Sequence, residues 1–137
     1  MKTALGVFVG MVMLSACEQR LHCDYRNYLT TVEIRQDSID IGYVNMGDSI
    51  EIPYVLKNSG SSALLIKDVI PSCDCTTASF SSKEVAPGDS TTIVLTYRAE
   101  DSKGYLYRTA EIVCNTRQHA ELTFTGHVMP SPRSAEM

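Results

Sequence analysis

Cys73 and Cys75, one residue apart, are the pair of side chains in this sequence that is best suited to chemistry. Two thiols at this spacing could exchange disulfides, or could bind a soft metal ion together with His119 or His127. Zinc sites usually separate their cysteines by roughly two to four residues and add a second pair of ligands, and the sequence has neither feature. No Lys or Arg adjoins the cysteines to stabilise a thiolate, and the charge of Asp74 opposes one. We therefore expect structural cysteines, with metal binding or thiol redox chemistry as the alternative.

Disulfide pairing is open, because Cys23, Cys73, Cys75 and Cys114 are all candidates and the sequence alone does not choose among their pairings. On a regular strand Cys73 and Cys75 would lie about 6.6 Å apart, near the upper limit of disulfide geometry. A bond between them would need a distorted backbone. Cys114 points inward by strand alternation, so either cysteine of the pair could reach it across two sheets. That bond would close a loop of roughly 40 residues and contribute roughly 3–4 kcal/mol in the chain-entropy model.

The sequence has few other patterns that indicate a chemical function. The 16 acidic residues outnumber the 12 basic ones, for a formal net charge of -4. Nucleic-acid affinity comes mainly from Lys and Arg on phosphates, so we expect no nucleic-acid partner. The sequence lacks His-Glu-x-x-His, Gly-x-Ser-x-Gly and glycine-rich phosphate-binding patterns, and its carboxylates and histidines are scattered. We expect no enzymatic activity and no cofactor.

The N-terminal segment predicts export and lipidation. Residues 4–14 form an apolar run that would span about 17 Å as a helix, too short for a bilayer core, which needs about 20 residues. The run suits a secretory signal. Leu14-Ser15-Ala16-Cys17 is similar to the bacterial lipoprotein box, in which the cysteine is acylated. We expect a signal peptide at 1–16 and a mature protein held by palmitate-type acyl chains on Cys17.

This anchor predicts a place for the protein in the bacterial cell envelope, either periplasmic or exposed at the surface. Residues 17–31 are polar and irregular, and we expect them to form a lipidated tether. The acidic body would gain nothing from an anionic membrane surface, so the lipid should hold the protein there. Residues 130–137 are expected to be a flexible tail.

Between residues 32 and 129 the pattern is that of β-strands. Short runs of alternating apolar and polar residues are separated by turn signals, and no segment shows a convincing helix period. We predict an all-β fold, an antiparallel β-sandwich of about seven strands. The expected inward sets are Ile39, Ile41 and Tyr43; Ile50, Ile52, Tyr54 and Leu56; Ile93, Leu95 and Tyr97; Leu106, Ala110, Ile112 and Cys114, with Arg108 as an exception; and Leu122, Phe124, Gly126 and Val128.

Turns and a proline refine this prediction. Asn45-Met46-Gly47-Asp48 and Ala86-Pro87-Gly88-Asp89 predict tight turns, the second of type II. Pro53 has no N–H to donate, so its strand should lie at a sheet edge or carry a bulge.

From residue 39 to residue 129 the order of these signals resembles a family of exported bacterial proteins with one Ig-like domain and no established function. The specific element is Ser72-Cys73-Asp74-Cys75-Thr76 followed by Pro87-Gly88, with Asp74 where the family usually has a small residue. The resemblance also uses Asp40-Ile41-Gly42, Gly47-Asp48, Leu56-Lys57-Asn58-Ser59-Gly60, Asn115 and Leu122-Thr123-Phe124-Thr125-Gly126. It implies an Ig-like sandwich related to interaction modules.

Together these observations predict a membrane-anchored envelope lipoprotein. Its Ig-like domain would be a non-catalytic interaction or structural module with a protein partner whose identity the sequence does not give. The alternative is a metal-binding or thiol-redox protein that uses Cys73 and Cys75, joined by Cys114 or His119. An enzyme with a substrate pocket ranks last, because no sequence feature supports it.

Overall fold

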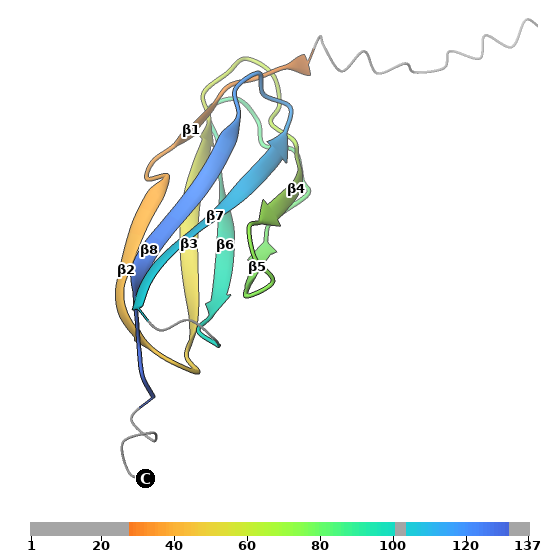
Figure 1. Cartoon of the computed structure of the whole chain (residues 1–137). Helices are drawn as coiled ribbons and strands as arrows, with labels where there is room; N and C mark the ends of the chain where they lie inside the picture. Colours follow the sequence, from red (N-terminus) through yellow and green to blue (C-terminus); the bar gives the residue numbers. More distant parts are fainter. Residues whose placement is uncertain (1–27, 101–103, 132–137) are drawn as a thin grey trace, which may run out of the picture.

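The computed structural model describes residues 28–100 and 104–131, and within these ranges the chain forms strands and no α-helix (Figure 1). The predicted signal peptide, Cys17 and Cys23 lie outside the described residues. The strands are β1 (Val32–Ile34), β2 (Ser38–Asn45), β3 (Ser49–Asn58), β4 (Ile66–Pro71), β5 (Thr76–Ser79), β6 (Ser90–Arg98), β7 (Gly104–Cys114) and β8 (Ala120–Met129).

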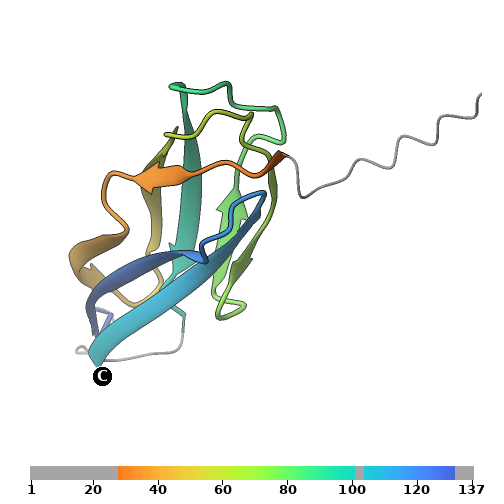
Figure 2. The ribbon, with the colours of Figure 1, turned by 90° about the horizontal axis from the view of Figure 1, so that it is seen from above.

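The strands form two four-stranded sheets, ordered β1-β3-β6-β5 and β2-β8-β7-β4. Figure 2 shows β7 and β8 on one side of the domain and β3 and β6 on the other. The predicted all-β sandwich is confirmed, with eight strands where we expected about seven. No helix in the described part of the chain is long and apolar enough to cross a membrane.

One strand pair departs from the antiparallel prediction. β2 pairs with β8 in parallel, whereas every other named pair is antiparallel. The parallel pairing arises because the chain passes from the first sheet to the second between β1 and β2. β1 pairs with β3 in the first sheet, and after the short link at 35–37 the chain continues in the same direction as β2 in the second sheet (Figure 1).

The core lies between the sheets and takes its side chains from both. The predicted alternation is confirmed on the four longest strands, whose inward residues are buried: Ile52, Tyr54 and Leu56; Ile93, Leu95 and Tyr97; Leu106, Ala110 and Ile112; Leu122, Phe124 and Val128. Across the interface, the ring centroids of Tyr97 and Phe124 lie 5.4 Å apart. The Tyr54 hydroxyl donates a hydrogen bond of 2.6 Å to the Thr123 carbonyl in the opposite sheet. Burial raises the pKa of Tyr54.

Arg108 is a charged residue at an inward position of β7, as the sequence predicted. Its Nε atom is buried without a hydrogen-bond partner, alone among the side chains that the structure describes. One terminal nitrogen of the guanidinium donates to the carbonyl of Tyr107 at 2.9 Å. Burial raises the pKa of Tyr97, and the positive charge of Arg108 offsets part of that rise.

Both predicted turns are present. Asp48 N–H donates to the Asn45 carbonyl at 3.0 Å and Gly47 has a φ of 94°. Asp89 N–H donates to the Ala86 carbonyl at 3.0 Å and Gly88 has a φ of 85°. Glycine at the third position of each turn supplies the left-handed conformation that a type II turn requires.

Pro53 lies in β3, which has a neighbouring strand on each side in its sheet. The predicted edge position therefore holds only for the part of β3 around Pro53, which β1 does not reach. β1 is short and pairs with residues 56–58 of β3, and Arg35 N–H reaches the Val55 carbonyl at 3.3 Å. Backbone groups two residues apart point to the same side of a strand, so those of Pro53 point past the end of β1. The missing N–H of Pro53 therefore leaves no ladder hydrogen bond unmade.

Two buried asparagines tie loops to the sandwich. Asn58 is fully buried, and its side-chain amide donates to the carbonyls of Ser62 and Val85, each at 2.8 Å. The Asn115 amide donates to the carbonyls of Tyr28 and Ala63. Thr30 donates to Asn58 Oδ1 at 2.7 Å, so the chain joins the domain before β1 begins.

Candidate functional site

The structure links Cys73 to Cys75 by a disulfide, a pairing that the sequence left open among several. Cys114, which either of them could have reached, is free. The two residues lie in the turn between β4 and β5, where Thr76 N–H donates to the Cys73 carbonyl at 3.2 Å. This turn brings the two Cα atoms to 5.3 Å, well inside disulfide range. The spacing estimated for a straight strand does not apply, because the chain is not extended here.

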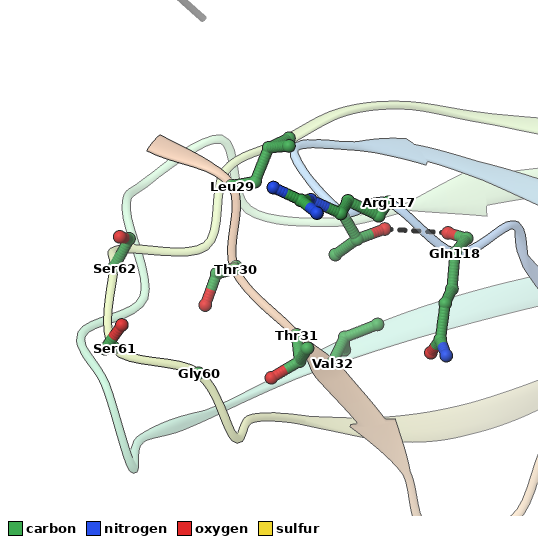
Figure 3. Close-up of a pocket in the computed structure, with 10 residues that line it drawn as sticks. Leu29, Thr30, Thr31, Val32, Gly60, Ser61, Ser62, Arg117 and Gln118 are labelled. Carbon is green, nitrogen blue, oxygen red and sulfur yellow. Dashed lines mark hydrogen bonds between the residues drawn. The ribbon is translucent and has the colours of Figure 1, made fainter. Parts of the chain in front are cut away.

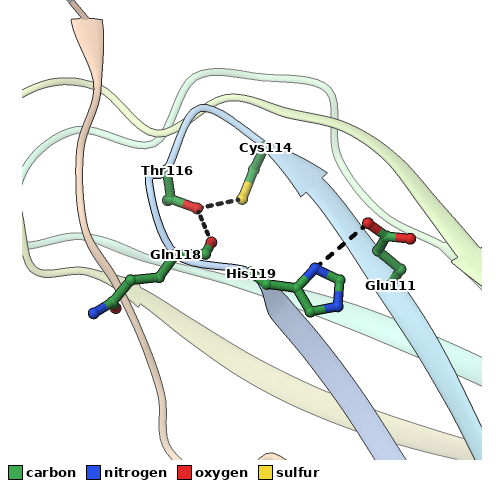
Figure 4. A network of polar contacts seen from close by, with 5 residues as sticks. All are labelled: Glu111, Cys114, Thr116, Gln118 and His119. Atoms are coloured by element: carbon green, nitrogen blue, oxygen red, sulfur yellow. Dashed lines mark hydrogen bonds and ion pairs between the residues drawn. The ribbon is translucent and has the colours of Figure 1, made fainter.

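Cys114 is a free, half-buried cysteine at the end of β7. Its sulfur lies 3.4 Å from the Thr116 hydroxyl, which in turn donates to the Gln118 carbonyl (Figure 4). Nearby, His119 Nδ1 lies 3.5 Å from a Glu111 carboxylate oxygen.

The structure does not bring Cys73, Cys75 and His119 together as a metal site. Both sulfurs of the cysteine pair are used in the disulfide. His119 instead contacts Glu111. Within 28–100 and 104–131, no three His, Cys, Asp or Glu residues form a group able to hold a metal ion.

The most distinctive surface is the outer face of the second sheet. Among the described residues, seven large apolar side chains are exposed, and five of them lie at outward positions of this sheet: Tyr43, Tyr105, Tyr107 and Met129 on β2, β7 and β8, and Ile70 on the edge strand β4. His127 on β8 lies between Tyr43 and Tyr105, because it pairs with Tyr43 on β2 and with Tyr105 on β7. We call Tyr43, Tyr105, Tyr107, His127 and Met129 the aromatic face.

A bulge in β2 places Tyr43 on this face. Asp40 pairs with Thr125 and Tyr43 with His127, so Ile41 and Gly42 together oppose the single residue Gly126. Gly42 takes a φ of 71°, a conformation that favours glycine, and its N–H donates to Asp40 Oδ1 at 2.8 Å. The extra residue shifts the alternation, so Val44 is buried and Tyr43 is 78% exposed. Our prediction that Tyr43 shares the inward face of Ile39 and Ile41 is therefore wrong.

Gly126 provides room for the bulge. A Cβ atom built on Gly126 would lie 2.7 Å from Ile41 Cγ1 and 2.9 Å from the Gly42 carbonyl oxygen. Any side chain at this position would have to displace Ile41 or the backbone of Gly42. The Asp40-Ile41-Gly42 and Gly126 elements of the sequence thus act together to position Tyr43.

The aromatic rings surround a hollow of about 120 Å³ lined by Asp40, Gly42, Tyr43, Tyr105, Thr125 and His127. The ring centroids of Tyr43 and Tyr105 each lie 5.7 Å from that of His127, with interplanar angles of 40° and 66°. The rings thus form inclined walls around the hollow and no flat platform. Asp40 contributes a carboxylate that uses one oxygen to hold the bulge.

A larger groove of about 560 Å³ lies at the opposite end of the domain, between residues 29–32, 60–62 and 116–118 (Figure 3). Its lining is mainly polar, and two of its hydroxyl groups already donate hydrogen bonds to other parts of the domain. Thr30 donates to Asn58, and Thr116 donates to the Gln118 carbonyl. We assign no function to this groove.

The sequence indicated His127 as a candidate ligand but did not predict the aromatic face. The alternation of Tyr105 and Tyr107 opposite to Leu106 was a usable signal, since it puts two aromatic residues on the polar side of a strand. Tyr43 had no such signal, because its outward position depends on the bulge.

These observations define a small all-β sandwich domain with an exposed aromatic face. Residues 32–128 match the family described as "Protein of unknown function (DUF1573)", and the chain belongs to that family. No curated protein sequence matches the chain.

Solved structures with low sequence identity share the fold. A protein of unknown function from Porphyromonas gingivalis W83 is 17% identical with a TM-score of 0.62, over 72% of this chain and 47% of that one. The chain thus spans about half the length of that protein. The ASH / PapD-like domain 7 of human CEP192 is 15% identical with a TM-score of 0.59, over 75% of this chain and 88% of that one. At these identities the likeness concerns the fold alone.

Proposed function

We propose that the β-sandwich is a non-catalytic binding module and that the aromatic face is the surface with which it binds a protein partner. The observation that carries this proposal is the gathering of Tyr43, Tyr105, Tyr107 and Met129 on one sheet face. Contiguous exposed apolar residues mark interaction sites, and Tyr and Met are enriched at protein interfaces. Similarity to a PapD-like domain supports a binding role by analogy of fold.

We further propose that acyl chains on Cys17 hold the module at the bacterial envelope. The lipoprotein box at Leu14-Ser15-Ala16-Cys17 supports this part of the proposal. Thr30 pairs with Thr116 beyond the C-terminal end of β7, whereas Tyr105 lies near the start of that strand. β7 has 11 residues, so its two ends lie roughly 35 Å apart. An anchor upstream of Thr30 would therefore leave the aromatic face free to meet a partner.

Cross-linking in native envelopes tests the binding role. The full chain is compared with the double variant Tyr43→Ala/Tyr105→Ala and with Tyr28→Ala. Tyr28 is a matched control because it is 61% exposed but lies outside the aromatic face. A partner adduct that the double variant loses and the control keeps is the expected result. An adduct that survives in the double variant would overturn the assignment of the surface.

Intact-mass spectrometry of the same membrane extract tests the anchor. A chain that begins at Cys17 and carries added acyl mass is expected. A chain that begins elsewhere, or that carries no acyl mass, would contradict the proposed anchor.

Thiol–disulfide exchange at Cys73 and Cys75 is a second candidate, favoured by their disulfide in a half-exposed turn. A thiolate of a partner dithiol would attack one sulfur, form a mixed disulfide and release the other cysteine as a thiolate. The partner's second thiol would then complete the two-electron transfer and leave both cysteines as thiols. A Cys75→Ser variant would trap the mixed disulfide through Cys73. Absence of any trapped adduct in native envelopes would exclude this candidate.

A further inference from the structure

We propose that the hollow between Tyr43 and Tyr105 receives a Lys or Arg side chain from an extended basic segment of the partner protein. This inference rests on the proposed binding role of the aromatic face and specifies the chemistry of the partner.

The walls of the hollow suit a cation. Tyr43 and Tyr105 flank His127 at centroid distances of 5.7 Å and are inclined to its ring by 40° and 66°. A cation that enters the hollow beside these rings can approach the π face of a tyrosine. A flat ligand such as a sugar ring would stack best on a coplanar platform, which the interplanar angles of 40° and 66° do not provide. The hollow of about 120 Å³ is of the size of one side chain.

Asp40 supplies the charge at this position. Its Oδ1 atom accepts the N–H of Gly42, which fixes the carboxylate beside the hollow. The exposed carboxylate keeps its other oxygen, Oδ2, outside this bond, so Oδ2 can accept a hydrogen bond from an ammonium or guanidinium group. A charge-assisted bond of this kind is roughly twice as strong as a neutral one.

Two further acidic side chains lie on the outer face of this sheet, and the exposed Lys67 lies on its edge strand β4. Glu111 on β7 and Glu121 on β8 are directly opposed in the strand register and both are exposed. Like charges in directly opposed positions are unfavourable. His119 already contacts Glu111 at 3.5 Å, and a cation from a partner would reduce the repulsion at Glu121. No Lys or Arg lies at an outward position of β2, β7 or β8.

The distance between the hollow beside Asp40 and the Glu111–Glu121 pair sets the spacing of the partner's cations. Glu121 and Gly126 both lie on β8, and the chain between them spans roughly 17 Å. An extended segment lying along β8 would therefore carry two basic side chains about four to six residues apart. One would enter the hollow and the other would lie near Glu111 and Glu121.

Fluorescence anisotropy with a designed probe tests this inference. The probe is a labelled, end-capped peptide of Ser and Thr with two Lys residues six positions apart, and the control peptide carries two norleucines in their place. The full chain, purified in detergent, is expected to bind the Lys peptide and not the norleucine peptide, and to bind less tightly as salt concentration rises.

The variants locate the binding. Tyr43→Ala/Tyr105→Ala is expected to weaken binding of the Lys peptide by about tenfold. Asp40→Asn keeps an acceptor for the Gly42 N–H but removes the charge, and is also expected to weaken binding. Tyr28→Ala should bind as the unaltered protein does.

The inference would be overturned if both peptides bound equally, if all variants bound the Lys peptide equally, or if a neutral oligosaccharide bound in place of the peptides. Cross-linking of two copies through the aromatic face would also overturn it, since the occupant would then be a second copy of this chain. The test is separable from that of the proposed function. If the Tyr variants lose the native partner adduct but the Lys peptide does not bind, the cationic inference fails and the binding face stands.

Discussion

The carbonyl oxygen of Gly42 lies where a side chain on Gly126 would have to be, 2.9 Å from a Cβ atom built at that position. This close approach lets two residues of β2 oppose one residue of β8, and the resulting bulge turns Tyr43 out of the sandwich. Two glycines far apart in the sequence thus position an exposed tyrosine of the candidate binding face.

Gly126→Ala should therefore harm both stability and the aromatic face. The added methyl group meets backbone on one side and Ile41 on the other, and overpacking of this kind costs roughly 1–3 kcal/mol. Urea denaturation measures the loss of stability, and the Lys peptide should bind the folded variant more weakly. Thr123→Ala is the matched control, because Thr123 is a half-exposed residue of the same strand outside the lining of the hollow, and it should change stability by less than roughly 0.5 kcal/mol.

The Cys73–Cys75 disulfide should contribute little to global stability. It joins residues two apart, so in the chain-entropy model its loss costs roughly 1.5 kcal/mol. We expect Cys73→Ser/Cys75→Ser to remain folded, with a small shift in its urea midpoint. A loss of roughly 3–4 kcal/mol, as a long-range bond would give, would contradict the short pairing.

Alkylation without reduction checks the same assignment. Of the cysteines in the described residues, only Cys114 is a free thiol. We expect mass spectrometry of the unfolded, unreduced protein to show Cys114 labelled and Cys73 and Cys75 unlabelled. Labelling of Cys73 or Cys75, with Cys114 protected, would show that the pairing differs.

Asn58→Ala should be among the most destabilising polar substitutions. Its amide and carbonyl groups bond the carbonyls of Ser62 and Val85, the Thr30 hydroxyl and the Gly60 N–H, all with Asn58 fully buried. Leaving a buried polar group without a partner costs roughly 1–3 kcal/mol. The substitution would leave several partners of the Asn58 side chain without a hydrogen bond. Asn45→Ala is the control, because Asn45 is exposed and its side chain makes one long bond of 3.3 Å to Asp48. Equal losses for the two variants, measured by thermal unfolding, would contradict the assigned role.

Tyr54 should make stability fall at high pH. Burial first, and the nearby charge of Asp37 second, raise the pKa of Tyr54 in the folded protein. An unfolded tyrosine ionises near its ordinary pKa of about 10, so the unfolded state loses a proton that the folded state keeps. Stability is therefore unaffected below this pH and falls as the pH rises above it. Tyr54→Phe should show a shallower fall, although it also loses the 2.6 Å bond to the Thr123 carbonyl. Equal slopes above pH 10 in both proteins would contradict this account.

The sequence predicted most of the sandwich because apolar alternation follows directly from the geometry of a strand. The inward sets of β3, β6, β7 and β8 and the glycine turns at Gly47 and Gly88 were all recognisable. Tyr43 was not, because a single extra residue reverses every position beyond it. The sequence left the disulfide pairing open, because Cys73 and Cys75 lie in a turn, where the spacing of a straight strand does not hold. The parallel pairing of β2 with β8 depends on where the chain changes sheet, which local pattern does not encode.

The aromatic face could be predicted only in part for the same reason. Tyr105 and Tyr107 sit on the polar side of a regular strand, so their exposure follows from alternation alone. Their convergence with Tyr43 and His127 on one hollow requires the register of three strands and the bulge at Gly42.

The most direct test of the central claim is cross-linking of the full chain in native envelopes, comparing the unaltered protein, Tyr43→Ala/Tyr105→Ala and Tyr28→Ala. Our account predicts a protein adduct with the unaltered chain and with Tyr28→Ala, and its loss in the double variant. An adduct that forms equally with all three proteins would contradict the claim that the aromatic face is the binding surface.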